Sequence, residues 1–276
     1  MTRRLGPLAR YAVLTAFLVV GGYPLLWMVL SALRPHHEIE AAPFALPLRP
    51  RLGNLADVLA NEGFGRAYLN STVVVVSSLL LVVVASSLAA YAFARLRFRG
   101  KEFLFFGVLA GMMIPVHVTL IPLNRLLGRP PFALKDTYPA LVGPYVAFAL
   151  PISILLLRGA FEGVPRELEE AARMDGCSAF GVFWRVALPL VRPTLAAVVI
   201  FNFLTMWNEF AFALTLINDT SMYTLPRALK SFADEAGVDM GRTSAALCVT
   251  VVPMLVLYAA AQKHIISGLT RGALKQ

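Results

Sequence analysis

Six long runs of apolar residues, separated by short polar segments, dominate the pattern along this chain. Each run has at least 19 residues and, apart from Glu209 in the fifth run, carries no formal charge. Because a helix needs about 20 apolar residues to cross the hydrocarbon core of a bilayer, each run predicts a membrane-spanning helix. The predicted spans are residues 11–33, 68–94, 103–123, 138–157, 193–217 and 244–262.

The second run is rich in valine and serine, which in water would favour a strand. Inside lipid, however, every backbone polar group needs an internal partner, so an open strand is excluded and a helix is expected. Prolines in the third and fourth runs remove backbone donors and bend their helices, either to line a cavity or only to kink the packing. These prolines are Pro115, Pro122, Pro144 and Pro151. The fold class expected is therefore an all-α integral membrane bundle, with residues 1–276 forming a single transmembrane domain.

Composition supports this interpretation and argues against several classes of protein and site. The chain is 58% hydrophobic and 15% charged, against about 25% charged in a typical soluble domain, which argues against a soluble globular enzyme. Cys177 and Cys248 lie far apart and outside any CxxC or Cys/His cluster, so neither a disulfide framework nor a zinc site is expected. His36 and His37 lie in the proline-rich segment 34–66 without a third ligand at a suitable spacing. We expect that segment to be a solvated external cap with little regular structure.

The distribution of basic residues orients the predicted spans. The N-terminus, the loop 95–101, the loop 158–192 and the C-terminal tail together hold 15 of the 25 Lys and Arg residues, and the opposite set of loops holds 10. The positive-inside tendency therefore places the first set, including both termini, in the cytoplasm. The basic N-terminus precedes a first run that is too long for an ordinary signal peptide and lacks a typical cleavage site, so we expect a retained span.

One polar stretch between the fourth and fifth spans breaks the pattern, and we call residues 165–189 the elbow segment. Pro165 and the glutamates that follow it are typical of a helix start. Gly176 is suited to end that helix with a left-handed residue. A second short helix is expected to carry an apolar stripe of Phe180, Phe183, Trp184 and Ala187. The pattern predicts a helix–turn–helix at the cytoplasmic face, although an interfacial helix lying on lipid headgroups has similar features.

The elbow segment also carries a specific motif. It reads Glu170-Ala171-Ala172, then Gly176, Val186 and Leu188-Pro189. This spacing resembles the cytoplasmic signature of permease subunits of binding-protein-dependent ABC importers, with Val in place of the usual Ile. Other segments resemble the smaller, maltose-type second permease of sugar importers. They are residues 95–101, 121–128, 207–226 and 264–275.

The resemblance implies that the elbow is the coupling segment, which sits in a cleft of the ATPase subunit. The residues implied to couple to the ATPase are Glu170, Ala171, Ala172, Asp175, Gly176, Leu188 and Pro189. It further implies a multi-pass protein of the bacterial cytoplasmic membrane that works with a second permease, an ATPase dimer and an extracytoplasmic sugar-binding protein. Membrane lipid is expected as a contact and nucleic acid is not.

The chain itself is not expected to hydrolyse ATP or to be an enzyme. Gly100-Lys101 is the only Gly-Lys pair, and its surroundings do not match the phosphate-binding loop GxxxxGK[ST]. No nucleophile–base or metal constellation is visible, so no catalytic residues, metal ligands or cofactors are expected here. ATP and Mg²⁺ would be bound by the partner ATPase.

Polar residues within the spans are the candidates for a substrate path. A carboxylate in a membrane costs about 2.5–3.5 kcal/mol at the bilayer centre, so Glu209 is expected to face the bundle or water. The path candidates are Asn202, Trp207, Asn208, Glu209 and His117. For Glu209 the alternative is an interhelical hydrogen bond at the outer rim. For His117 the alternative, which we favour, is a buried neutral histidine bonded to a neighbouring helix.

Two other functions have to be weighed against a sugar permease. An ABC permease could carry a polyol, a glycerophosphodiester, an amino acid or another small solute, although a phosphate-bearing cargo would favour basic residues in the spans. An ion-coupled secondary carrier typically has intramembrane acids and repeated halves. This sequence has one candidate intramembrane acid and no visible internal repeat, which argues against a secondary carrier.

Overall fold

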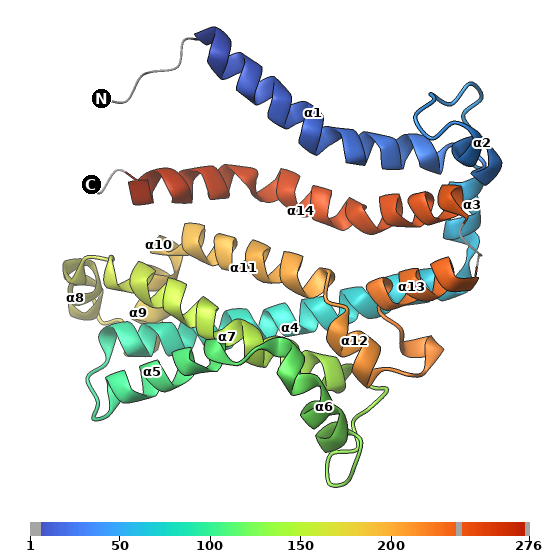
Figure 1. Cartoon of the computed structure of the whole chain (residues 1–276). Helices are drawn as coiled ribbons and strands as arrows, with labels where there is room; N and C mark the ends of the chain where they lie inside the picture. The colour runs from blue at the N-terminus through green and yellow to red at the C-terminus, as the bar shows by residue number, and fades with distance from the viewer. Residues whose placement is uncertain (1–6, 236–238, 274–276) are drawn as a thin grey trace. The chain divides into compact units, whose positions relative to one another are not determined.

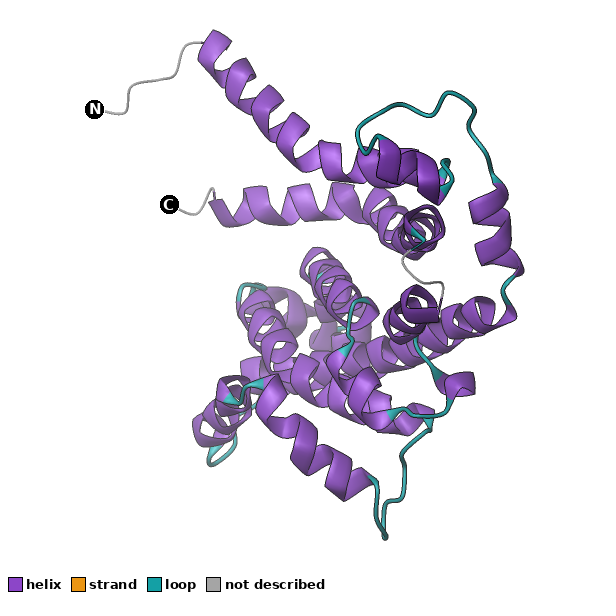
Figure 2. Cartoon of the chain, turned by 45° about the vertical axis from the view of Figure 1, so that its right-hand side comes forward, coloured by secondary structure: helices purple, strands orange, loops and turns teal. Residues whose placement is uncertain are grey.

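The computed structural model describes residues 7–235 and 239–273 of the chain. Throughout these residues the regular structure is helical, with loops between helices and no strand (Figure 2). Contacts divide the chain into two compact units, which are described separately below. The first comprises Met1–Gly65 and Ala228–Pro253, and the second comprises Arg66–Arg227 and Met254–Gln276.

Within the described residues, four helices are long and apolar enough to cross a membrane, and the number rises to six if each of two bent helix pairs counts as one span. The expected all-α membrane fold is thus confirmed. The four helices contain most of the first predicted span and all of the second, fourth and sixth. They are α1 (Pro7–Ala32), α4 (Glu62–Arg95), α7 (Tyr138–Glu162) and α14 (Met240–Ala273), which are labelled in Figure 1.

The third predicted span is not one continuous helix. It consists of α5 (Lys101–Ala110), the short η1 (Gly111–Met113) and α6 (Val116–Leu127), with a bend of 95° between the two arms. Pro115 causes the break, because a proline disfavours helical backbone in the residue before it. Ile114 is accordingly extended, with φ −82° and ψ 114°.

The fifth predicted span, 193–217, is also interrupted. Helix α11 (Arg192–Trp207) ends before Asn208, and α12 (Ala211–Leu216) follows as a separate short helix. At its other end α11 meets the preceding helical stretch at 76°. A single straight span through Glu209, as expected from hydropathy, is therefore wrong, and Glu209 lies in the break between two helices.

Within the first unit, the segment 34–66 is more ordered than its sequence suggested. It contains α2 (His36–Ala41), α3 (Gly53–Ala60) and the first turn of α4. The buried Arg34 guanidinium donates to the carbonyl oxygens of Glu38 at 2.6 Å and Ala42 at 2.9 Å, which satisfies acceptors at the end of α2. The expectation of little regular structure is wrong, because one basic side chain organises the backbone carbonyls around it.

The second unit contains the elbow segment and most of the predicted path. Its remaining elements are α8 (Arg166–Met174), α9 (Ala179–Val182), the π-helical turn η2 (Phe183–Ala187), α10 (Leu188–Leu190) and η3 (Thr220–Met222). Helix α13 (Leu225–Glu235) begins in this unit and continues into the other. Figure 1 shows α8 and α9 at one end of α7, with α6 and α12 towards its other end.

A hydrophobic cluster fixes the elbow end of the second unit. Phe161 and Leu157 of α7 are fully buried, together with Phe183 and Ala187 of η2. Tyr91 of α4 packs its ring against Phe161 and Phe183, with centroids 5.4 and 5.1 Å apart. The cluster therefore joins α4 and α7 to η2 of the elbow segment.

At the opposite end, side chains of α4 hold the segment before α13. The Asn70 amide donates to the carbonyl oxygens of Ser221 at 2.9 Å and Tyr223 at 3.0 Å. The neighbouring Ser71 hydroxyl accepts the Leu225 N–H at 2.7 Å. These three hydrogen bonds hold residues 221–225 against α4, in a part of the chain whose position the hydrophobic pattern does not predict.

Candidate functional site: the elbow segment and the helix break at Glu209

The turn that ends α8 has the geometry that glycine was expected to provide. Gly176 has φ +86°. Its N–H donates to the Arg173 carbonyl, and the Cys177 N–H donates to the Ala172 carbonyl, both at 3.0 Å. This pair of bonds is the Schellman arrangement, in which a left-handed residue satisfies the last carbonyls of a helix. The Ser178 hydroxyl then accepts the Gly181 N–H at 3.1 Å and caps α9.

Most of the predicted coupling residues lie on an exposed surface. Glu170, Ala171, Asp175 and Gly176 are exposed and Ala172 is half-buried. Beside them Met174 is 88% exposed, although it is a large apolar side chain. Methionine is a flexible, polarizable side chain that is frequent at protein-binding surfaces.

The other predicted members of the motif lie in a different environment. Leu188 and Pro189, at the start of α10, are half-buried. In the apolar stripe, Phe183 and Ala187 are buried whereas Phe180 and Trp184 are 63% and 49% exposed. The π-helical turn shifts the register, so that the expected single stripe divides between the core and the surface.

Sequence reasoning missed the most enclosed charge of the elbow, Glu169. Its carboxylate receives the Arg95 Nε–H at 2.6 Å and the Tyr91 hydroxyl at 3.1 Å. The side chains of Arg95 and Glu169 are only 7% and 5% exposed. The three glutamates of the elbow and the basic loop 95–101 were visible in the sequence, but the sequence does not show which glutamate turns inward towards α4.

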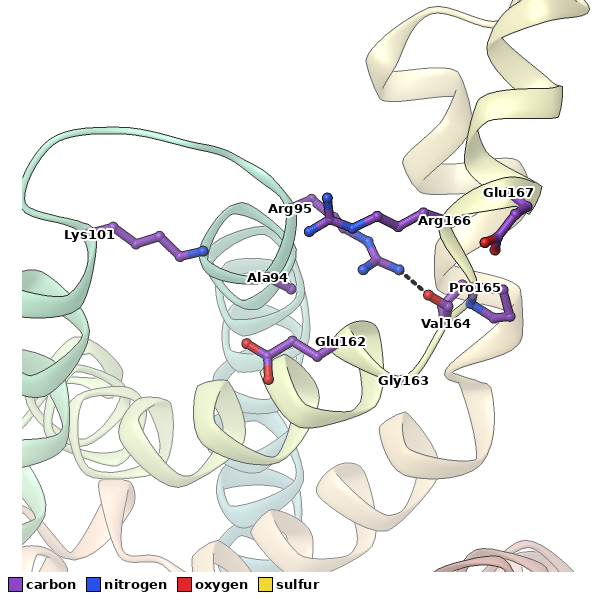
Figure 3. Close-up of a pocket in the computed structure, with 9 residues that line it drawn as sticks. All are labelled: Ala94, Arg95, Lys101, Glu162, Gly163, Val164, Pro165, Arg166 and Glu167. Carbon is purple, nitrogen blue, oxygen red and sulfur yellow. Dashed lines mark hydrogen bonds between the residues drawn. The ribbon is translucent and has the colours of Figure 1, made fainter.

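Arg95 also lines a cleft of about 580 Å³. Figure 3 shows the residues that line this cleft. Arg95, Lys101 and Arg166 bring positive charge to its wall, and Glu162 and Glu167 bring negative charge. Arg95 also donates from Nη2 to the Val164 carbonyl at 2.6 Å, which is the dashed line in Figure 3.

A second charged group connects α5 to α7 near the same end. The Arg158 guanidinium pairs with Glu102 at 3.0 Å and with Glu162 at 2.8 Å, and it lies 4.0 Å above the ring of Phe105. Both carboxylates are about half-exposed, so this pairing contributes little by itself to stability. Its geometry nevertheless fixes the start of α5 against the end of α7.

Among the predicted path residues, Asn202 and Trp207 lie inside the helix packing. Asn202 is 3% exposed and donates to the Ser153 hydroxyl at 3.0 Å and the Val198 carbonyl at 2.8 Å, thereby joining α11 to α7. Trp207 is 2% exposed and stacks on Phe203 with the centroids 5.4 Å apart. In this conformation both side chains are largely enclosed by neighbouring helices.

Asn208 and Glu209 occupy the break between α11 and α12. Asn208 is exposed, and its amide donates to the Leu204 carbonyl at 2.7 Å, at the end of α11. The Glu209 carboxylate accepts the Phe212 N–H at 2.8 Å and the Tyr145 hydroxyl at 2.8 Å. Glu209 thus caps the start of α12 and bonds to α7, which is the interhelical role weighed as its alternative.

Glu209 also borders a small cavity. The cavity has a volume of about 120 Å³ and a mostly apolar wall of side chains from α6, α7, α11 and α12. Phe148, Phe201 and Phe212 contribute aromatic rings to it, and Asn202 and Glu209 contribute polar groups. Aromatic faces with few polar groups are the usual composition of a small-molecule site.

His117 lies in the first turn of α6 and is exposed. The favoured expectation of a buried histidine bonded to a neighbouring helix is therefore wrong. The break at Pro115 is the reason, because it starts a new helix whose first turn is not covered by the bundle. No set of three or more His, Cys, Asp or Glu residues in the described parts of the chain is arranged to hold a metal ion.

The family model described as "Binding-protein-dependent transport system inner membrane component" matches residues 60–271. The probable ABC transporter permease protein YurM of Bacillus subtilis is 35% identical over 271 residues, which cover 98% of this chain and 89% of the relative. The diacetylchitobiose uptake system permease protein NgcG of Streptomyces coelicolor is 36% identical, with 96% and 88% covered. The arabinooligosaccharides transport system permease protein AraQ of Halalkalibacterium halodurans is 33% identical, with 94% and 92% covered.

Among solved structures, the chain is similar to one from a bacterial ABC transporter involved in the import of the acidic polysaccharide alginate. The TM-score is 0.80 at 22% identity, and the match covers 96% of this chain and 100% of the other. A chain of the alginate transporter in complex with its alginate pentasaccharide-bound periplasmic protein matches with a TM-score of 0.70 at 16% identity, covering 91% and 90%. At these identities the likeness shows a shared fold.

Proposed function

Because this chain belongs to the family of inner membrane components of binding-protein-dependent transport systems, we propose that it is a permease subunit of an ATP-driven sugar importer. Relatives that match nearly its whole length are named for the transport of diacetylchitobiose, arabinooligosaccharides and trehalose. The single observation that carries the mechanism is the exposed end of α8, where Glu170, Ala171 and Gly176 face solvent. Such a surface is available to a separate motor subunit.

The membrane orientation of the proposal follows from charge. The elbow segment, the loop 95–101 and both termini face the cytoplasm of a bacterium, since they hold the larger share of basic residues. The chain would then lie in the cytoplasmic membrane as a multi-pass protein, with residues 1–276 acting as one transmembrane domain. The break at Asn208 and Glu209 would face the opposite side, to which an extracytoplasmic binding protein delivers solute.

The proposed transport cycle needs partners at both faces. A second, similar permease completes the pathway, and two ATPase subunits bind ATP and Mg²⁺ and move α8 when they close. The Schellman turn at Gly176 supports this role, because its two backbone bonds make the end of α8 a defined shape rather than a loose loop. The bundle then alternates between states open to either side, while ATP is hydrolysed by the partner and not by this chain.

The cavity at Glu209 is the proposed start of a solute path. Its aromatic rings would lie against the apolar faces of a sugar, and Glu209 would accept hydrogen bonds from hydroxyl groups when its present partners release it. Asn208 and His117, which are both exposed, are further candidates. Trp207 and Asn202 would support the path through packing in this conformation, since both are buried.

A reconstituted system tests the proposal. The chain is placed in proteoliposomes with its second permease and ATPase, and uptake of radiolabelled oligosaccharide is measured with the binding protein outside and ATP inside. Uptake should require both ATP and the binding protein, and it should continue when an uncoupler collapses the ion gradients. Immediate loss of uptake with the uncoupler, while ATP is maintained, would indicate an ion-coupled carrier and contradict the proposal.

A further inference from the structure

The two contacts of Arg95 join three segments of the chain. Arg95 is the last residue of α4, and its guanidinium donates to the Glu169 carboxylate in α8 and to the Val164 carbonyl in the connection from α7 to α8. A planar guanidinium can hold two acceptors at once in a fixed geometry, which an ammonium group cannot. The end of α4 is thereby fixed to both sides of the short connection that leads into α8.

Tyr91, one turn earlier on α4, completes the arrangement. Its hydroxyl donates to the second oxygen of the Glu169 carboxylate, so both oxygens of that group are held by α4. The same ring packs against Phe161 and Phe183, which precede and follow α8 in sequence. The Arg95 guanidinium, the Tyr91 hydroxyl and the Tyr91 ring therefore all contact α8 or the segments that precede and follow it.

The burial of this group distinguishes it from the surrounding charges. Arg95 and Glu169 have side chains 7% and 5% exposed, whereas the partners of Arg158 in the nearby ion pairs are 56% and 48% exposed. A buried charge pair is poorly screened and breaks only at a large cost, while an exposed pair exchanges readily with water. Of these groups, the buried one is suited to transmit a displacement.

We propose that Tyr91, Arg95 and Glu169 form a rigid joint through which displacement of α8 moves α4, so that these are positioning residues for transport. This inference rests on the proposed function, because it assumes that an ATPase moves α8. It also assigns different roles to two adjacent glutamates. Glu170 faces the partner, and Glu169 faces inward and passes the movement into the membrane.

Three conservative substitutions test the joint in the full complex. Glu169→Gln removes the charge and keeps the shape, Arg95→Lys keeps the charge and loses the two-pronged geometry, and Tyr91→Phe removes one hydroxyl and keeps the ring packing. Glu167→Gln, on the exposed side of the same helix, is the matched control. The readouts are the amount of assembled complex, its rate of ATP hydrolysis, and the solute transported per ATP hydrolysed.

For Glu169→Gln and Arg95→Lys we expect assembly and hydrolysis to persist, and solute per ATP to fall roughly tenfold, the factor expected for loss of one hydrogen bond to a charged group. Tyr91→Phe should give a smaller fall of about threefold, because its hydrogen bond to Glu169 is longer, at 3.1 Å, than the 2.6 Å bond from Arg95. A normal ratio of solute to ATP in Glu169→Gln would overturn the joint. So would a loss confined to the yield of folded subunit, which is the signature of a merely structural role.

A distance measurement provides a second, independent readout. Spin labels at positions 97 and 167, introduced after replacement of the native cysteines, report the separation of the α4 end from α8. The wild-type distance should be the same with and without ATP, and Glu169→Gln should broaden it. A wild-type distance that changes on ATP binding would show that α8 moves independently of α4 and would overturn the inference. Failure of the wild-type permease to bind any ATPase would instead overturn the proposed function.

Discussion

Substitutions of Gly176 can separate the effect of backbone strain on the subunit from the effect of added bulk on partner docking. Its φ of +86° is a conformation that glycine adopts freely and that costs other residues about 1–2 kcal/mol. A Cβ added there would meet no atom within 4 Å, so inside the subunit the backbone alone sets the cost. A cost of 1–2 kcal/mol corresponds to a factor of roughly 5–30 in an equilibrium, enough to disfavour the turn without unfolding the bundle.

Three variants of Gly176 distinguish backbone strain from added bulk. Gly176→Asn should keep the turn, since asparagine tolerates positive φ, and should test the added bulk at the exposed surface. Gly176→Ala should strain the turn with little bulk, and Gly176→Val should do both, because a β-branched residue is a severe outlier at positive φ. We expect the thermal midpoint of the isolated subunit to fall in the order Asn, Ala, Val, and all three variants to retain less ATPase on co-purification.

The assay compares the melting temperature in detergent with the fraction of ATPase retained and the rate of uptake. Normal retention and uptake in Gly176→Val would refute the reasoning, because that variant carries both the strained backbone and the bulk. A large loss of thermal stability in Gly176→Asn would refute the claim that the backbone alone sets the cost inside the subunit.

Three further outcomes follow from individual contacts. Glu170→Lys should leave the melting temperature unchanged, because Glu170 is exposed, and should abolish ATPase co-purification. Gly241→Ala should destabilise the protein by about 2–3 kcal/mol in thermal unfolding, because a Cβ there would overlap the Arg34 carbonyl oxygen. Ser153→Ala should cost about 1–2 kcal/mol in the same measurement, since it leaves the buried Asn202 amide with one partner fewer.

Controls for these outcomes come from the same chain. Gly107→Ala, in an open position within α5, should be neutral or slightly stabilising, unlike Gly241→Ala. Equal melting temperatures for the two glycine variants would contradict the steric argument. A marked stability loss in Glu170→Lys would mean that this side chain supports the fold rather than a partner surface.

The sequence predicted the helical fold well where hydrophobicity alone decides the structure. The apolar runs at 68–94 and 138–157 lie within α4 and α7, because a bilayer leaves helix as the only way for a single run to satisfy its backbone. The glycine turn was also predictable, since positive φ has a strong residue preference.

Several of the failures originate in packing between segments distant in sequence. A proline at position 115 predicts a bend, but the size of the bend depends on what α5 and α6 pack against. The end of α11 before Glu209 depends on the Tyr145 hydroxyl and on the N–H groups of α12. Similarly, the choice of Glu169 over Glu170 as the inward residue depends on where α4 places Arg95. Tyr145 lies 64 residues from Glu209, and Arg95 lies 74 residues from Glu169.

The central claim is that the exposed end of α8 is covered by a separate ATPase. Met174, which is 88% exposed on that surface, is replaced by a photo-crosslinking amino acid in the assembled complex, and Phe103, 82% exposed on α5, receives the same substitution as the control. Crosslinks from position 174 should join this chain to the ATPase polypeptide, and those from position 103 should not reach it. If position 174 captured only lipid, the account would be contradicted.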